Sequence, residues 1–302
     1  MESKSSKSVK GDAARFHVLL WRLNVAVCAV HFCLALWILV SKFALNQDWE
    51  IPVATSFVSW HKSESTKGCG GEDNGNCYVS HEIIVFKNLS RISLSGLVMA
   101  FHFLSFSWQL VVVVNEEARE YYMREIRKGQ NVLRWLEYSL SAPLMIIVIS
   151  VLLGIVDVVV LALLAVCTCA LMGFGYLQET TVLRNSRTAS AVPHGMGWIL
   201  FVLTWSAISF VFWVGLRESD AKPPSGILPV IYSVYFLMIS LFGCFGFVQA
   251  SQVWQGRRRD TTDVFKYKVE AAYVILSLVS KATLGVLVFW GITVRDSILV
   301  FN

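Results

Sequence analysis

The chain has 302 residues, of which 55% are hydrophobic and only 16% are charged. Soluble globular chains carry about 25% charged residues, so this composition excludes an ordinary soluble protein and favours one that spans a membrane. The net charge of +5 is expected to come from basic residues that flank membrane helices, and we therefore predict contact with membrane lipid and no nucleic-acid partner.

Residues 1–14 are polar and basic, and we predict that they form a cytoplasmic tail with no cleavable signal peptide. Residues 15–302 are predicted to form one domain, an all-α bundle of seven transmembrane helices, because seven apolar runs have the roughly 20 residues that a span needs. The expected spans are 16–45, 91–114, 131–154, 156–178, 195–216, 226–253 and 268–294. A tight helical hairpin is expected near Gly154.

The one long loop, residues 46–90, is predicted to be an extracellular β-hairpin. Residues 49–60 and 77–86 are β-prone, and they flank a turn rich in Gly, Asn and Asp. Cys69 and Cys77 border that turn; we expect a disulfide between them, with two free thiols as the alternative. The sequon at Asn88 lies so close to the membrane that we do not expect it to be glycosylated.

Basic residues predict how the bundle is oriented. Sixteen Lys and Arg residues fall on the side of the N-terminus and eight on the other side. Because cytoplasmic flanks carry the excess of basic residues, the N-terminus is predicted to be cytoplasmic and the C-terminus extracellular. We expect the protein in the plasma membrane.

Two ionisable residues lie deep within predicted spans. Lys281 is in the middle of the seventh span, and Glu137 lies about two turns inside the third. A charge at that depth is costly, so such residues are usually functional. A desolvated lysine amine can condense with an aldehyde, and a carboxylate beside it would keep the resulting imine protonated. The alternative is a structural ion pair.

The stretches around these residues resemble a known family. RWLEYSLSAPLM (134–145) resembles the third-helix motif of microbial rhodopsins, and its Glu-Tyr-Ser form is similar to that of heliorhodopsins. YVILSLVSK (273–281) resembles the retinal motif of that family's seventh helix, and FGYLQE (174–179) is a weaker match. Inverted topology and a β-rich first outer loop are also heliorhodopsin traits.

The resemblance implies that Lys281 binds all-trans retinal covalently and that Glu137 is its counterion. Ser277, one turn before Lys281, and Ser141 are expected beside them. His31 matches a buried histidine of a cytoplasmic-side proton-accepting network in the family. The remaining expected lining residues are Trp205, Tyr235 and Phe236.

The second helix departs from the family pattern. A second histidine is expected about where Gln109 stands, but His102 lies seven residues earlier, about 10 Å further outward. A proton acceptor made of two histidines is therefore not expected.

The family implies a light sensor that isomerises retinal from all-trans to 13-cis, forms a homodimer and signals to an unidentified cytoplasmic partner. The alternative is a light-driven or light-gated proton transporter. Against a pump, Val148 stands eleven residues after Glu137, where pumping relatives carry a carboxylate. We expect no enzyme activity and no metal site, because the sequence has no metal-ligand cluster, phosphate loop or nucleophile–base motif.

Overall fold

The computed structural model describes residues 2–61, 81–183, 191–218, 226–256 and 262–300. In the described part of the chain, seven helices are long and apolar enough to cross a membrane, as predicted. They are α1 (Glu2–Ala44), α2 (Leu94–Val114), α4 (Val132–Leu152), α5 (Val158–Leu183), α6 (Ala191–Glu218), α7 (Ile227–Gly256) and α8 (Asp263–Val300). The polar residues expected as a tail continue helix α1, which begins at Glu2.

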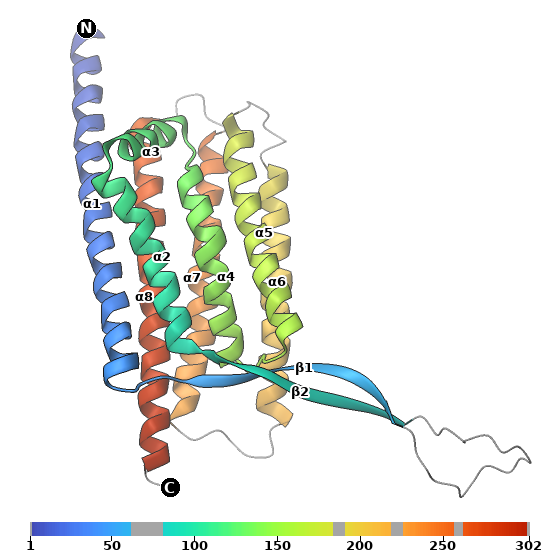
Figure 1. Ribbon diagram of the computed structural model, residues 1–302. Coiled ribbons are helices and arrows are strands. Elements are labelled where there is room, and N and C mark those ends of the chain that lie inside the picture. The colour runs from blue at the N-terminus through green and yellow to red at the C-terminus, as the bar shows by residue number, and fades with distance from the viewer. Residues whose placement is uncertain (1, 62–80, 184–190, 219–225, 257–261, 301–302) are drawn as a thin grey trace, which may run out of the picture.

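The helices stand roughly parallel in one bundle (Figure 1). We call the end at which α1 begins the N-terminal side, and the end that carries the strands the hairpin side. Helices α4 and α8 are the inner pair: 67% and 56% of their spans are buried, against 22–28% in the others. Because α4 carries Glu137 and α8 carries Lys281, both charges lie between helices and not against lipid.

An additional helix, α3 (Glu116–Lys128), lies across the N-terminal side (Figure 1). The Asn115 side chain caps its start by accepting a hydrogen bond from the Ala118 amide, and Gly129 ends it at φ 87°. One face of α3, including Tyr122 and Met123, is buried. This helix was not predicted, because the segment has no apolar run long enough for a span.

A sharp turn joins α4 to α5, as predicted. Gly154 adopts a φ of 97°, which only glycine reaches without strain. The Ile155 amide donates to the Ser150 carbonyl at 2.9 Å, which closes the turn. Residues of this turn also bind the β-hairpin.

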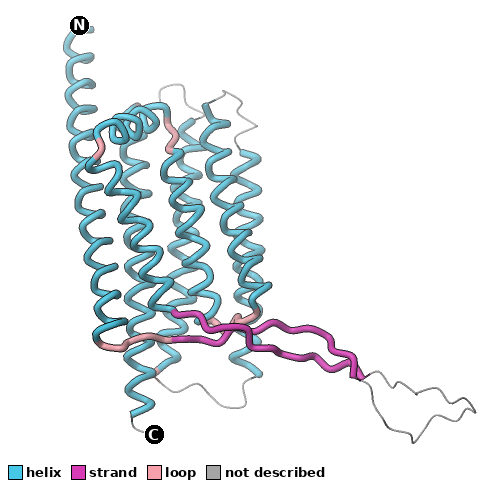
Figure 2. The backbone as a smooth tube through the Cα atoms, in the orientation of Figure 1, coloured by secondary structure: helices cyan, strands magenta, loops and turns pink. Residues whose placement is uncertain are grey.

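The predicted hairpin is present as two antiparallel strands, β1 (Glu50–His61) and β2 (His81–Ser93), that project sideways from the bundle (Figure 2). The second strand continues seven residues past the predicted end at residue 86, so Asn88 lies within it and is exposed. Strand β1 is attached to the α4–α5 turn, because the Ala54 amide donates to the Val156 carbonyl and the Ser56 amide to Asp157. Cys69 and Cys77 lie outside the described residues.

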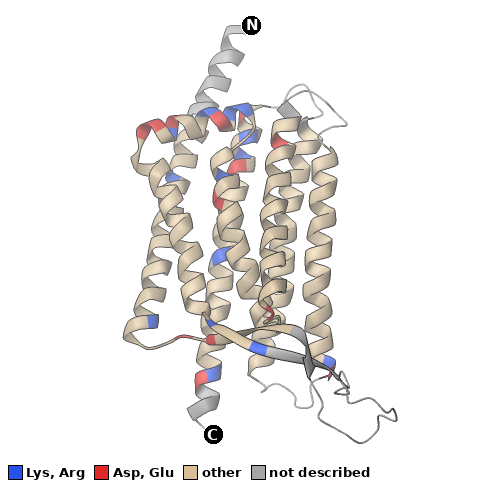
Figure 3. Ribbon diagram, turned by 45° about the vertical axis from the view of Figure 1, so that its right-hand side comes forward, with Lys and Arg blue, Asp and Glu red and all other residues tan. Residues whose placement is uncertain are grey.

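The two sides of the bundle differ in composition. The largest apolar core fills the hairpin side; it includes Ile38, Leu94, Val98, Val148, Ile149, Leu284, Val288 and Ile292. Charged residues gather instead toward the N-terminal side, on α3 and the adjoining helix ends (Figure 3). The candidate site lies where these two regions meet.

Candidate functional site

The ammonium group of Lys281 is buried and fully hydrogen-bonded. Its Nζ atom donates to Glu137 Oε1 and to Ser105 Oγ, both at 2.6 Å, and to Ser277 Oγ at 3.1 Å. An ammonium has three N–H donors, so these three oxygens satisfy it. The structure thus brings together three of the predicted residues, Lys281, Glu137 and Ser277.

Glu137 has a second partner in the same group. Ser105 Oγ, on α2, donates to Glu137 Oε1 at 2.6 Å. Both ions are at least nine-tenths buried, and leaving either without its partner would cost several kcal/mol. Sequence reasoning missed Ser105, because α2 also carries Ser95 and Ser107 and nothing local distinguishes one serine from another.

A large cavity begins at Lys281 and extends between α4, α5, α6 and α7. It encloses about 790 Å³ of space that no atom fills, part of it open to the surface. The wall is mostly apolar and aromatic; it includes Trp135, Tyr138, Met145, Met172, Trp198, Phe201, Phe242 and Phe245. Predicted Ser141 is in this wall, and its Oγ has no partner among the described residues.

Two glycines of the wall make room for its tryptophans. A Cβ atom on Gly175 would lie 2.3 Å from the Trp135 ring, and one on Gly246 would lie 2.6 Å from the Trp198 ring. Both distances are impossible contacts, so any side chain at these positions would displace an indole. The cavity therefore keeps its shape because Gly175 of α5 and Gly246 of α7 have no side chain.

The three predicted aromatic residues lie outside the described wall of this cavity. Trp205 is one layer behind it and packs on Phe201 and Phe242, with ring centroids 6.2 and 5.9 Å away. Tyr235 stacks on the Phe212 ring, and Phe236 is 53% exposed on the outside of the bundle. Their place in a retinal pocket stays a prediction, because the described cavity lies toward the N-terminal side, about a turn or more away along α6 and α7.

A second cavity, of about 440 Å³, lies on the other side of the Lys281–Glu137 pair. Ten of the thirteen residues that line it have a polar side-chain atom, so its wall is more polar than that of the first cavity. The polar lining residues are Asn24, Ser105, Trp108, Gln109, Tyr122, Arg134, Glu137, Tyr138, Glu270 and Ser277. We call it the polar cavity, and it leads from Glu137 toward the N-terminal side.

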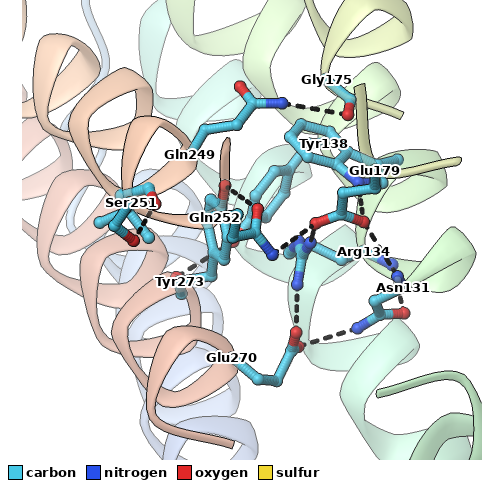
Figure 4. Close-up of polar contacts among 12 residues, drawn as sticks. Asn131, Arg134, Tyr138, Gly175, Glu179, Gln249, Ser251, Gln252, Glu270 and Tyr273 are labelled. Carbon is cyan, nitrogen blue, oxygen red and sulfur yellow. Dashed lines mark hydrogen bonds and ion pairs between the residues drawn. The ribbon is translucent and has the colours of Figure 1, made fainter. Parts of the chain in front are cut away.

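At the far end of the polar cavity, Arg134 is buried against two carboxylates (Figure 4). Its guanidinium forms ion pairs with Glu179 of α5 and with Glu270 of α8. Glu270 also accepts from Tyr122 Oη at 3.0 Å and from Asn131 Nδ2 at 2.8 Å. Glu270 was not predicted as a site residue: it lies about two turns after the start of α8, where an acid can equally face the membrane surface.

His31 and His102 form a buried pair. Their Nδ1 atoms are 2.9 Å apart, and neither residue is exposed to solvent. The expectation that His102 stands too far outward to join His31 was therefore wrong: counting along α2 says nothing about the depth at which α1 crosses it. A Cβ on Gly285 would lie 3.2 Å from His102, so the pair lies one turn beyond Lys281 toward the hairpin side, not toward the N-terminal side as predicted.

Comparison with solved structures supports the fold. Thermophilic rhodopsin aligns with a TM-score of 0.59 over 94% of this chain and 96% of its own, at 12% identity. The rhodopsin of Exiguobacterium sibiricum aligns with a TM-score of 0.60 over 92% and 96%, at 10% identity. Such low identities establish a shared fold and nothing further.

Comparison with protein sequences and with family models identifies the family. No curated protein matches it. The family model described as Heliorhodopsin matches residues 20–293, which is nearly the whole chain and includes both motifs around Glu137 and Lys281. The chain therefore belongs to the heliorhodopsin family.

Proposed function

We propose that this protein is a retinal-binding light sensor of the membrane that carries no net proton current. Family membership and the rhodopsin fold support a retinal-binding, light-responsive protein. The observation that carries the site assignment is Lys281 Nζ, a buried amine held by Glu137 at the mouth of an apolar cavity. A structural ion pair alone would not need that cavity.

The residues fit the cofactor. The apolar, aromatic wall suits a polyene, and the amine at its end suits an aldehyde. Lys281 Nζ would hold retinal through a covalent bond to its aldehyde carbon, with the release of one water. Bound retinal would supply light absorption and isomerisation from the all-trans to the 13-cis form.

The protein's own residues then control one proton. Glu137 keeps a negative charge beside Nζ, which holds the proton there in the dark. Ser105 and Ser277 orient the pair and stay as hydrogen-bonding partners when the geometry around Nζ changes. Tyr138 and Trp135 exclude water on the side of the apolar cavity.

Net transport would need a proton path on the hairpin side as well. Val148, Ile149 and Leu284 lie there, all fully buried in an apolar core. Apolar packing of this kind does not conduct protons without water. We therefore propose that the proton leaves and returns on the N-terminal side. The alternative, a light-gated or light-driven proton transporter, requires the His31–His102 pair to pass the proton on toward the hairpin side.

The proposal includes the orientation of the protein in the membrane and its assembly. The charge bias supports a cytoplasmic N-terminus and an extracellular C-terminus. The family resemblance implies a homodimer, and the hairpin, which reaches sideways past the helices, is available for that contact (Figure 2). Signalling to a cytoplasmic partner would use the N-terminal side.

An absorption spectrum with added all-trans retinal tests the binding proposal. The purified protein should gain a visible band, whereas Lys281→Ala should fold and stay colourless. Ser280→Ala, next to Lys281 on the same helix and also in the cavity wall, is the matched control and should keep the band. A visible band that survives Lys281→Ala would refute the assignment.

Electrical recording from illuminated cells tests the absence of transport. We expect no photocurrent at any voltage or under either pH gradient. A reproducible current that follows the proton gradient would favour the transporter.

Tags at the two ends test the orientation. The C-terminal tag should be stained on intact cells and the N-terminal tag only after permeabilisation. The opposite pattern would contradict the inverted topology.

A further inference from the structure

We infer that Glu270 is the group that accepts the proton released at Lys281, and that the polar cavity carries the proton to it. The inference deepens the proposed function and rests on it. It assigns a role to the buried cluster of Arg134, Glu179 and Glu270, which retinal binding by itself does not use.

The polar cavity is built to hold water. Three buried polar atoms on its wall, Trp108 Nε1, Gln109 Oε1 and Arg134 Nε, have no hydrogen-bond partner among the described residues. Buried polar groups are nearly always paired, and a polar cavity of this size supplies the missing partners as ordered water. The same wall contains Glu137 and Ser277 at one end and Glu270 at the other. A continuous water chain can therefore join Lys281 Nζ to Glu270.

The cluster at the far end carries one negative charge too many. Glu270 receives only donors, from Tyr122 of α3, from Asn131, which caps the start of α4, and from Arg134 of α4. Glu179 also receives only donors, from Asn131, Arg134, Trp135 and Gln252 of α7. Surroundings made of donors alone fit two ionised carboxylates, because an ionised carboxylate only accepts hydrogen bonds. One guanidinium cannot neutralise both, and a proton on either acid would relieve the repulsion.

Access decides which of the two acids takes the proton. Glu270 is in the wall of the polar cavity, whereas the described wall does not include Glu179. The same wall includes neither His31 nor His102, which lie on the hairpin side of Lys281. In the step, the N–H bond at Lys281 breaks and leaves its electron pair on nitrogen. Each water passes one proton along, and an O–H bond forms on Glu270; the reverse path restores the dark state.

Protonation of Glu270 would also change a contact of helix α3, which lies on the surface of the N-terminal side. Tyr122 donates its hydroxyl proton to Glu270 Oε1, and it is the contact that connects α3 to the cluster. A neutral acid is a weaker acceptor than a carboxylate, so this bond weakens when the proton arrives. Helix α3, whose other face is exposed, is thus placed to report the state of the site.

Infrared difference spectroscopy, light minus dark, tests the inference. We expect a new carboxylic-acid C=O band that rises as the visible band shifts to the blue. Glu270→Gln should abolish this band and slow the proton's departure by about a hundredfold. The matched control is Glu125→Gln, which removes another buried carboxylate of the N-terminal side that pairs with Lys128 and lies outside the described cavity wall; it should change neither.

Two further variants test separately the charge of the Arg134 cluster and the polar cavity as the route of the proton. Glu179→Gln leaves one carboxylate for Arg134, so the Glu270 band should be smaller and decay sooner. Gln109→Leu removes a polar atom of the wall without touching the cluster, so the band should arise late but at full size. In the retinal-free protein, acidification should produce the same carboxyl band, and that band should be missing only from Glu270→Gln.

The outcomes distinguish this inference from the function on which it rests. If the unmodified protein gains no visible band with retinal, the proposed function fails. If the band forms and bleaches but the carboxyl signal persists in Glu270→Gln, Glu270 is not the acceptor and the inference is overturned. A variant that loses the visible band is judged by the retinal-free titration, where an unchanged carboxyl signal in Glu270→Gln would equally overturn it.

Discussion

The two halves of the bundle bury different kinds of residue. On the N-terminal side, Arg134, Glu179 and Glu270 are buried together with polar partners from α1, α3, α4 and α7. On the hairpin side, none of the described buried residues is an Asp, Glu, Lys or Arg, and the core is apolar. Lys281 and Glu137 stand at the boundary between the two halves.

The difference between the two halves limits where a proton can move. Charges in a bilayer interior persist only where partners or water compensate them, so a path for protons must be built in advance from polar groups. The N-terminal side has such a path and the hairpin side has the His31–His102 pair followed by apolar packing. The asymmetry supports exchange of a proton on one side only.

The largest expected effect comes from placing a carboxylate in the apolar half. Val148 is fully buried, and Val148→Asp would put an acid there without a partner. The expected loss of unfolding free energy is on the order of 5 kcal/mol, because an unpaired buried charge is not compensated. Thermal unfolding in detergent measures it, and recording under illumination should still find no photocurrent.

Val148→Thr is the control for this experiment. It keeps the shape and adds a hydroxyl but no charge, so it should cost only about 1–2 kcal/mol. If Val148→Asp were as stable as Val148→Thr, water would have to reach the hairpin side, and the contrast between the halves would be false.

A smaller effect is expected at the boundary. Glu137→Gln removes the charge that faces Lys281 but keeps an acceptor for Ser105. We expect a loss of about 3 kcal/mol, because the lysine loses its buried counter-charge. With retinal bound, the visible band should move to the red, or to the near ultraviolet if the proton is lost. An unchanged spectrum at neutral pH would mean that another carboxylate compensates the charge.

The smallest effect is expected at the edge of the hairpin side, where α1, β1 and α2 meet. Asp48 accepts from Lys42 at 2.9 Å and from Ser93 at 2.7 Å. Burial would raise the pKa of Asp48, but hydrogen bonds from Lys42, Ser93 and Ser95 and the charge of Lys42 outweigh it, so this pKa is lowered. Asp48→Asn should cost about 1 kcal/mol at neutral pH, because the pair is partly exposed.

The pH dependence of that loss provides the check. A lowered carboxyl pKa contributes stability that is complete above the ordinary pKa and is lost as pH falls through the lowered one. Unfolding curves of the variant and the unmodified protein should therefore differ equally at all pH values above the ordinary carboxyl range and converge in stronger acid. A difference that widened in acid would contradict the assigned pKa direction.

Local sequence predicted the parts of the site that have a strong local signal. A lysine amid sixteen uncharged neighbours and a glutamate two turns inside a span stand out because buried charges are costly. Ser277 followed from helical spacing, since residues four apart share a face. Trp205, Tyr235 and Phe236 are not in the described wall of the cavity, because aromatic residues recur along the whole length of α6 and α7 and the sequence does not tell at which depth the cavity lies.

The amino-acid sequence alone was enough to predict the seven spans, the hairpin, the tight α4–α5 turn and the pairing of Lys281 with Glu137. Hydropathy, glycine conformation and the cost of a buried charge all act within a few residues or within one helix. Three contacts could be seen only once the helices were packed: Ser105 joins that pair, His31 contacts His102, and Arg134 binds two carboxylates from different helices. Each of these contacts depends on the rotation and depth of one helix against another, which side-chain packing sets and no single helix encodes.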